Sequence, residues 1–184
     1  MKRKLAAGLA IMGLLVTLTG CKGDSGAIKA TADEKGNYIV NGSFEDAELT
    51  GWTLNNVDNV TEELGVYERE TDCYDGVQCL HFYSSRDVNF TVEQSLKGLE
   101  KGNYKLTGYA QGDTAGDANS SIYIYAIVNG ETIKADITLN GYLAWNAAEL
   151  NNLNITDGKV TIGISVTNAP GGWGTIDNIS LIKE

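Results

Sequence analysis

The sequence predicts an all-β protein, an antiparallel β-sandwich. Short runs of β-branched and aromatic residues recur after residue 38, separated by turns rich in Gly, Asn and Asp, and no hydrophobic stripe has helical spacing. Several short strands spaced in this way are typical of a sandwich or barrel. The clearest predicted strands are residues 80–84, 90–96, 104–111, 121–128, 132–139, 160–167 and 175–182.

Alternation within these runs predicts which side chains form the core. In residues 160–167 every second side chain is aliphatic, and residues 121–128 show the same alternation at Ile122, Ile124, Ala126 and Val128. Successive side chains of a strand point to opposite faces of a sheet. We therefore expect the aliphatic faces to pack together as a core about 10 Å thick.

The same parity predicts an outward face of unusual composition. It carries rings and hydrogen-bonding groups in place of Lys and Glu, at His81, Tyr83, Tyr109, Gln111, Tyr123 and Tyr125. A sugar ring can lie on an aromatic face while its hydroxyl groups bind amides and phenols, and aromatics beside a few polar groups are typical of ligand sites. The alternative is that tyrosines simply favour strands, with their hydroxyl groups in water.

The three tryptophans fall into two classes. Trp52 follows a glycine near the first strands, where we expect a core role. Trp145 follows a turn, and Trp173 lies in a glycine-rich loop with few neighbours able to bury it. Because an exposed ring without a partner costs solubility, we predict that Trp145 and Trp173 bind a ligand.

Charge excludes some partners. The 184 residues carry a formal net charge of −10, and removal of Lys2, Arg3 and Lys4 with a signal peptide would leave −10 − 3 = −13. Such an acidic surface repels nucleic acid and anionic lipid but is indifferent to a neutral ligand. Solubility alone is the alternative explanation of the acidity.

The N-terminus resembles a bacterial lipoprotein signal. A charged start and a short apolar stretch precede Leu18-Thr19-Gly20-Cys21. The resemblance implies cleavage before Cys21, a lipid on its sulfur, and a location on the extracellular side of the membrane. The predicted organisation is a signal at 1–20, a flexible tether at 21–37 and a sandwich domain at 38–184. An ordinary secretory peptide or an N-terminal membrane helix is the alternative.

Two further cysteines are close in the sequence. Cys73 and Cys79 are separated by five residues, and outside the cytoplasm such a pair can form a disulfide. A metal site is the rival interpretation. It is weak because the chain has no second Cys pair and His81 is its one histidine.

Short motifs at both ends of the domain resemble galactose-binding-like β-sandwiches, which have a jelly-roll fold. These motifs are Asn41-Gly-Ser-Phe-Glu45, Gly51-Trp52 and Ile176-Asp-Asn-Ile-Ser-Leu181. Other segments resemble the family 61 carbohydrate-binding modules of bacterial endo-β-1,4-galactanases, namely Leu80-His-Phe-Tyr-Ser84, Gln111-Gly-Asp113, Ile122-Tyr-Ile-Tyr-Ala126, Trp145, Val160-Thr-Ile-Gly-Ile-Ser-Val166 and Gly172-Trp-Gly174. The resemblance implies binding of β-1,4-galactan.

The resemblance to galactose-binding-like sandwiches implies one structural Ca²⁺ between the first and last strands. Glu45 and Asp177 match its acidic positions, and Ser43 and Asp75 are candidate carbonyl donors. Calcium requires several oxygen ligands, backbone carbonyls included. The alternative is that both carboxylates bind only backbone N–H groups.

The sequence favours a non-catalytic, lipid-anchored, glycan-binding protein. His81 is the one imidazole, and no Gly-x-Ser-x-Gly motif accompanies it. A neighbouring glycoside hydrolase or sugar transporter would be its functional partner. The alternatives are a structural or protein-binding surface lipoprotein, and a fragment of a galactan-degrading glycoside hydrolase.

Overall fold

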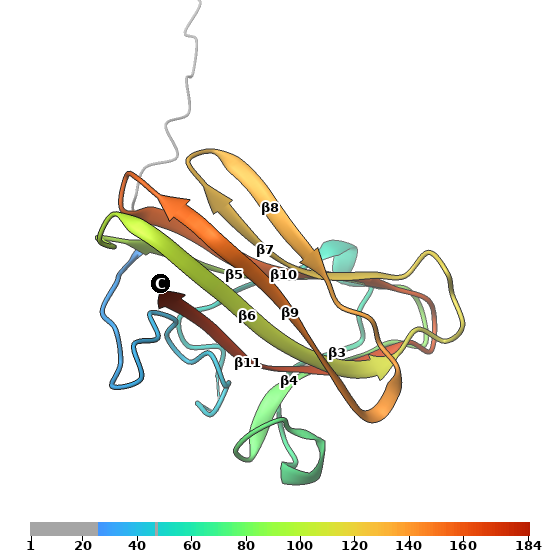
Figure 1. The fold of residues 1–184 in the computed structure, drawn as a ribbon. Coiled ribbons are helices and arrows are strands. Elements are labelled where there is room, and N and C mark those ends of the chain that lie inside the picture. The colour runs from blue at the N-terminus through green and yellow to red at the C-terminus, as the bar shows by residue number, and fades with distance from the viewer. Residues whose placement is uncertain (1–25, 47) are drawn as a thin grey trace, which may run out of the picture.

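Two stacked β-sheets form the domain, as the sequence predicts (Figure 1). The computed structural model describes residues 26–46 and 48–184, so the predicted signal and Cys21 lie outside the described residues. Within those ranges the helical elements are two single turns, η1 (Val57–Asn59) and η2 (Glu70–Asp72). None of the helices described has the length and apolar character needed to span a bilayer.

The first sheet has the order β1-β5-β10-β7-β8, and β2 also pairs with β5. Its strands are β1 (Ile28–Lys29), β2 (Thr53–Asn56), β5 (Val88–Lys97), β7 (Ser121–Val128), β8 (Glu131–Asp136) and β10 (Lys159–Asn168). The second sheet has the order β3-β4-β11-β6-β9. Its strands are β3 (Glu63–Glu68), β4 (Gln78–Tyr83), β6 (Gly102–Asp113), β9 (Gly141–Ile155) and β11 (Trp173–Lys183).

All seven predicted runs correspond to strands, and the pairing is antiparallel except between β1 and β5. The strands β1, β2, β3 and β9 are not among the runs that the sequence predicts. β9 is the longest strand, but polar residues at both of its faces and an irregular register hide its alternation. Its pairing with β6 supplies the regularity that its own sequence lacks.

The core lies between the sheets and confirms the predicted parity. The alternating aliphatic residues of β7 and β10 are all buried, as are Leu80 and Phe82 of β4. Trp52 is 8% exposed, stacks on Phe44 with ring centroids 5.4 Å apart, and donates a 2.9 Å hydrogen bond to the carbonyl of Asn41. Its predicted core role is confirmed.

The sandwich begins earlier than predicted. Ile28 and Lys29 pair in parallel with Leu96 and Lys97 of β5, and Asn37 bridges Ile182 of β11. Residues 28–37 therefore belong to the folded domain, and the prediction of a tether over all of 21–37 is wrong for this part. The pairing partners lie more than 60 residues away in the chain, so a local composition rich in polar and small residues could not reveal them.

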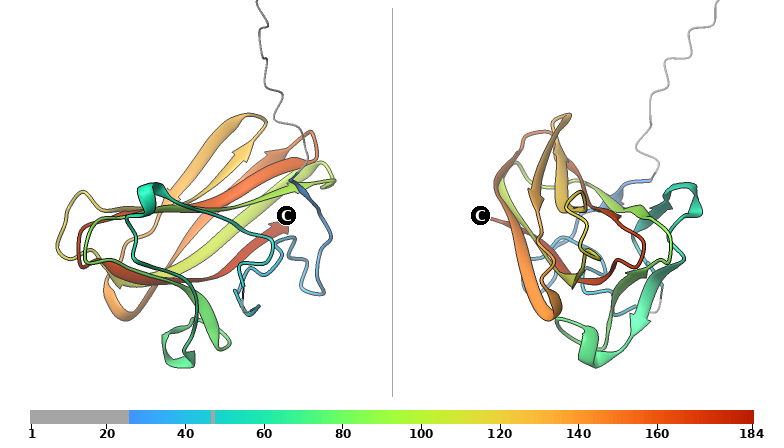
Figure 2. Two further views of the ribbon diagram at one scale, coloured as in Figure 1. Left: turned by 180° about the vertical axis from the view of Figure 1, so that it is seen from behind. Right: turned by 90° about the vertical axis from the view of Figure 1, so that its right-hand side faces the viewer.

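One loop projects from the sandwich. The segment between β3 and β4, which contains η2, protrudes at the bottom of both views in Figure 2. It then folds back along the outer face of the second sheet, where its backbone binds side chains of β6 and β11. We call this segment, residues 69–77, the β3–β4 loop.

Candidate functional site

The predicted outward set is divided between two opposite faces. His81 and Tyr83 on β4 and Tyr109 and Gln111 on β6 belong to the second sheet, together with Trp145 on β9 and Trp173 on β11. Tyr123 and Tyr125 on β7 belong to the first sheet. The expectation of a single face is wrong because parity distinguishes inward from outward positions but not one sheet from the other.

Three rings cluster on the outer face of the second sheet. Tyr74 of the β3–β4 loop stacks on Tyr109 of β6, with centroids 4.0 Å apart and planes 23° apart. Tyr74 also makes an edge-to-face contact with Trp145 of β9, with ring centroids 5.5 Å apart and ring planes at 74°. Tyr74 is 43% exposed, and it is not among the predicted site residues because it lies in a loop, where strand parity does not apply.

A second pair of rings lies beside this cluster. Trp173 at the start of β11 and Tyr142 of β9 have centroids 6.3 Å apart, with planes tilted by 48°. Tyr142 is 55% exposed and was also missed. It belongs to an irregular stretch, residues 142–145, that loops out where β6 runs straight from Ala110 to Gly112. We call Tyr74, Tyr109, Tyr142, Trp145 and Trp173 the aromatic site.

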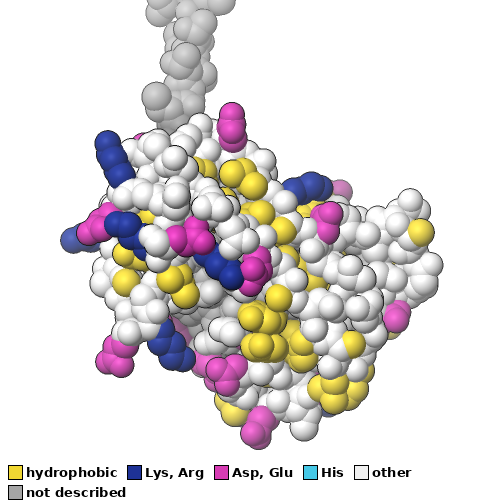
Figure 3. All heavy atoms as spheres, in the orientation of Figure 1, with side chains coloured by type: hydrophobic (Ala, Val, Ile, Leu, Met, Phe, Trp, Pro, Cys, Tyr) yellow, Lys and Arg dark blue, Asp and Glu magenta, His cyan; other side chains and the backbone are white. Residues whose placement is uncertain are grey.

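Other apolar side chains are exposed around the aromatic site. In Figure 3, hydrophobic side chains gather below the centre of the view, over the region where Figure 1 draws β9 and β11, and charged side chains are spread around them. Exposed Leu143 and Val77 extend the aromatic site at the irregular stretch of β9 and the β3–β4 loop. An exposed apolar patch of this kind marks a binding surface.

Gln111 lies beneath the aromatic site and is fully buried. Its Nε2 donates a 2.9 Å hydrogen bond to the main-chain carbonyl of Asp72, and its Oε1 accepts one from the N–H of Leu143. The amide therefore joins the β3–β4 loop to the irregular stretch of β9. Its polar atoms face protein, so the structure gives Gln111 a supporting position instead of the predicted contact with a sugar.

The side chain of Asp72 reinforces the same junction. Its carboxylate accepts a 2.9 Å hydrogen bond from the hydroxyl of Tyr142 and others from Thr71 and Arg69. Partial burial acts to raise the pKa of Asp72, but these hydrogen bonds outweigh it and hold the pKa below its usual value. The ionised carboxylate therefore keeps Tyr142 oriented.

His81 lies at the edge of the aromatic site. Its ring stacks on Tyr67 with centroids 4.8 Å apart, and its Nε2 is 3.9 Å from the carboxylate of Glu63. Nδ1 is buried with no hydrogen-bond partner among the described residues. Burial lowers the pKa of His81, so the ring is neutral near pH 7. Tyr83, two residues along β4, lies opposite Trp173.

Two carboxylates fasten the β3–β4 loop. Asp177 accepts hydrogen bonds from the N–H groups of Tyr74, Asp75 and Asn178, and Glu45 accepts them from those of Val77 and Gln78. Burial and, to a smaller extent, the charge of Glu45 raise the pKa of Asp177 to about 7, although these hydrogen bonds act to lower it. These bonds are the ones that the alternative to calcium binding predicts.

No group of three or more His, Cys, Asp or Glu side chains within the described ranges is arranged to hold a metal ion. A calcium site at Glu45 and Asp177 would therefore depend on carbonyl and amide oxygens. Ser43, whose carbonyl was a predicted donor, is half-buried in the turn between Asn41 and Phe44. Calcium remains a prediction.

The remaining cysteines lie side by side under the loop. Their sulfur atoms are 2.9 Å apart, and both residues are thiols in the structure. Cys79 is buried on β4 and Cys73 is partly covered in the β3–β4 loop. Burial raises the pKa of both thiols. The predicted disulfide remains a prediction. The loop already places the two sulfur atoms close together.

Known structures share this arrangement of strands. TmCBM61, solved in complex with β-1,4-galactotriose, superposes with a TM-score of 0.72 at 22% identity, covering 80% of this chain and 99% of that one. The chain has the β-sandwich fold of carbohydrate-binding modules. The xylan-binding CBM22-1 domain of Paenibacillus barcinonensis Xyn10C is less similar to this chain, with a TM-score of 0.52 at 16% identity over 77% of this chain and 90% of that one.

A family 16 carbohydrate-binding module is also similar in fold, with a TM-score of 0.55 at 15% identity over 80% of this chain and 100% of that one. No family model and no curated protein matches the sequence. The comparisons confirm the predicted all-β sandwich and the resemblance to carbohydrate-binding modules.

Proposed function

We propose that this module binds β-1,4-galactan, or a related galactose-containing polysaccharide, at the aromatic site without hydrolysing it. The observation that carries the proposal is the convergence of five rings, from two strands of the second sheet, the irregular stretch of β9 and the β3–β4 loop, onto one outer face. The neighbouring fold solved with galactotriose supports the choice of ligand.

The geometry of the rings suits a chain of sugars better than a flat apolar partner. Tyr74 and Trp145 meet nearly at right angles, and Trp173 lies beside Tyr142 at a tilt, so the rings do not form one plane. A ring can bind the C–H patch of a sugar, and each such contact contributes through buried apolar area. The hydroxyl of Tyr142, held by Asp72, is a hydrogen-bonding group at the rim.

The acidic group nearest the rings is poorly suited to catalysis. Asp72 is tied by hydrogen bonds to Tyr142, Thr71 and Arg69, and its pKa is lowered. A general acid for glycoside cleavage needs a raised pKa and a second carboxylate across a cleft. This supports binding without turnover.

We also propose that Ca²⁺ braces the β3–β4 loop between Glu45 and Asp177. Two carboxylates lie close enough for the charge of one to raise the pKa of the other. The side-chain oxygen of Gln78, whose N–H binds Glu45, is buried with no hydrogen-bond partner among the described residues. Carboxylate oxygens are among the ligands that Ca²⁺ prefers, and backbone carbonyls such as those of Ser43 and Asp75 would have to complete the set.

The proposed place of action is the extracellular side of the bacterial membrane, with Cys21 carrying the lipid. The lipoprotein-like sequence Leu18-Thr19-Gly20-Cys21 supports it. Replacement Cys21→Ser should release the protein from the membranes of its own host, as measured by fractionation. Recovery of the wild-type protein in the soluble fraction, or with its first 20 residues still attached, would contradict the proposal.

A glycan array with the full-length protein in detergent tests the ligand. We expect retention on β-1,4-galactan and no released oligosaccharide after long incubation. Binding to another glycan would show that the proposed ligand is wrong and leave the proposed site in place. Release of products would show that the protein is an enzyme. Binding to no glycan would favour the alternative of a protein-binding surface lipoprotein.

A further inference from the structure

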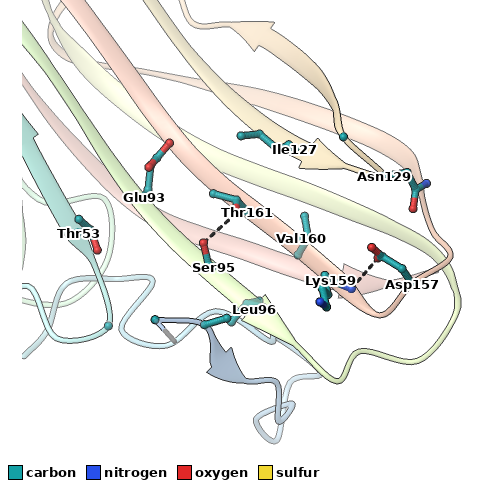
Figure 4. A pocket seen from close by; sticks show the side chains of 14 residues that line it. Thr53, Glu93, Ser95, Leu96, Ile127, Asn129, Asp157, Lys159, Val160 and Thr161 are labelled. Atoms are coloured by element: carbon teal, nitrogen blue, oxygen red, sulfur yellow. Dashed lines mark hydrogen bonds between the residues drawn. The ribbon is translucent and has the colours of Figure 1, made fainter. Parts of the chain in front are cut away.

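The outer face of the first sheet has a groove of about 580 Å³ on the opposite side of the sandwich from the aromatic site (Figure 4). β5 and β10 form its floor, β2 contributes Thr53 on one side, and the turn between β7 and β8 lies on the other. Its polar lining includes Thr53, Glu93, Ser95, Asn129 and Thr161. We call it the hydroxyl groove.

One row of residues across the sheet holds the carboxylate of Glu93 in place at this groove. Tyr125 of β7 and Glu93 of β5 both lie opposite Gly163 of β10. A Cβ atom at Gly163 would lie 2.5 Å from Cζ of Tyr125, so the ring occupies the space that the glycine leaves. Its hydroxyl crosses β10 and donates a hydrogen bond to Oε1 of Glu93.

The side chain of Tyr125 is buried, and its hydroxyl positions Glu93. Tyr125 is 7% exposed, and burial, followed by the hydrogen bond to Glu93, raises its pKa, so it stays a donor. Glu93 is half-buried and lines the groove, with Oε1 held by this donor. A carboxylate fixed in this way can accept hydrogen bonds from a ligand at little further entropic cost.

The next row supplies hydroxyl groups. Ser95 and Thr161 lie opposite each other on β5 and β10, and their oxygens are 2.8 Å apart. A hydroxyl has one donor and two acceptor positions, so this shared bond leaves capacity on both residues. Figure 4 shows Glu93, Ser95 and Thr161 side by side at the floor. The floor thus offers hydroxyl and carboxylate oxygens to one ligand.

We propose that the hydroxyl groove is a second carbohydrate-binding face, which takes a neutral polysaccharide chain through hydrogen bonds, so that one domain holds two chains on opposite sides. The polyhydroxylated surface of a sugar matches the donors and acceptors of the floor. In the groove lining the carboxylates of Glu93 and Asp157 outnumber the cation of Lys159, and together with the net charge of −10 they disfavour a polyanion. The proposal goes beyond binding at the aromatic site and does not depend on it.

The test separates the two faces with variants of the full-length protein in detergent. Trp145→Ala with Trp173→Ala disables the aromatic site, and Thr161→Trp fills the groove. Thr167→Trp is the matched control, because it lies on the same strand with the same parity but outside the groove lining. Calorimetric titrations with β-1,4-galactotetraose, xylotetraose and cellotetraose give the affinity and the number of sites.

The wild type should bind at two sites, and the Trp145/Trp173 variant should keep one. Adding Thr161→Trp to that variant should weaken the remaining binding about tenfold or more, about 1.4 kcal/mol, while Thr167→Trp should leave it unchanged. If Thr161→Trp fails to fold, Glu93→Gln decides, since it keeps the shape while removing the charged acceptor and should weaken the remaining binding severalfold.

The proposal of a second face would be wrong if the titrations show a single site and neither Thr161→Trp nor Glu93→Gln weakens binding there. If Thr161→Trp abolishes binding in the wild type while the Trp145/Trp173 variant binds normally, the groove stands and the proposed function of the aromatic site fails. The two proposals therefore fail under different results.

Discussion

The buried amide of Gln111 donates a 2.9 Å hydrogen bond to the main-chain carbonyl of Asp72, and with this bond β6 holds the β3–β4 loop against the second sheet. The same amide accepts a hydrogen bond from the N–H of Leu143. One side chain therefore sets the distance between the segments that carry Tyr74 and Tyr142. The aromatic site is built from irregular segments that a buried polar group keeps in place.

Replacement Gln111→Ala should weaken galactan binding although the residue does not face the ligand. It leaves the N–H of Leu143 without its acceptor and the carbonyl of Asp72 with the hydroxyl of Thr175 as a remaining side-chain donor. This loss should also lower the free energy of unfolding by about 1–3 kcal/mol. Gln94→Ala is the matched control, because Gln94 is equally buried and its amide pairs with both backbone groups of Val40, away from the site.

Urea unfolding and calorimetry on both variants separate stability from binding. We expect similar losses of stability, with weaker binding for Gln111→Ala alone. Equal galactan affinity in the two variants would show that Gln111 does not position the rings.

Each of Trp145→Ala and Trp173→Ala should weaken galactan binding by about 1–3 kcal/mol, because a stacking ring is lost. Both rings are half-buried on the outer face, so the fold should survive. Trp52→Ala should instead lower the free energy of unfolding by about 3–5 kcal/mol, since it leaves a core cavity. Titrations and thermal melts test the three variants, and normal binding by both surface variants would place the ligand elsewhere.

The neutral ring of His81 should make stability depend on pH. Burial lowers its folded pKa below the unfolded value of about 6.5, so the unfolded state binds more protons. The contribution of His81 is present above pH 6.5 or so and is lost as the pH falls toward the folded pKa. Urea unfolding of wild type and His81→Phe, from pH 8 to about 5, gives the difference in unfolding free energy.

Comparison with His81→Phe is necessary because Asp177, with a pKa of about 7, titrates nearby with the opposite sign. Its raised pKa contributes stability at low pH that is lost as the pH rises. Both proteins share this effect, so it cancels in the difference. A difference that stays constant over this range would show that the pKa of His81 is not lowered by folding.

Chelation should lower the melting temperature if Ca²⁺ braces the β3–β4 loop. A ligand that binds only the folded state stabilises it by about 2.7 kcal/mol at a hundred times its dissociation constant. Glu45→Ala and Asp177→Ala should abolish the response to added calcium, and Glu149→Ala, on β9, should retain it. If the melting temperature of calcium-free wild type ignores added calcium, the ion is absent from this fold.

Oxidised glutathione should convert the thiols of Cys73 and Cys79 into a disulfide, with glutathione reduced to two thiols. Mass spectrometry should show the loss of two hydrogen atoms, which is about 2 Da. Closure of so short a loop should raise the free energy of unfolding by about 2 kcal/mol. Cys73→Ser is the control. A protein that keeps both thiols under these conditions would contradict the predicted pairing.

The sequence by itself determined the all-β class, the strands of regular alternation and the buried side of each. Period-two alternation is a local property, so the aliphatic faces of β7 and β10 and the core position of Trp52 follow from residues close together in the chain. The resemblance to carbohydrate-binding modules also follows from short local motifs, and the comparisons confirm the fold.

Only the tertiary structure decided which outward residues share a face. Tyr109 and Tyr125 have the same outward parity, but β6 pairs within one sheet and β7 within the other. Pairing between distant strands also brings the loop residue Tyr74 onto Tyr109 and buries Gln111 beneath both segments. Strand partners are chosen by the packing of the whole sandwich, and a local pattern carries no record of that choice.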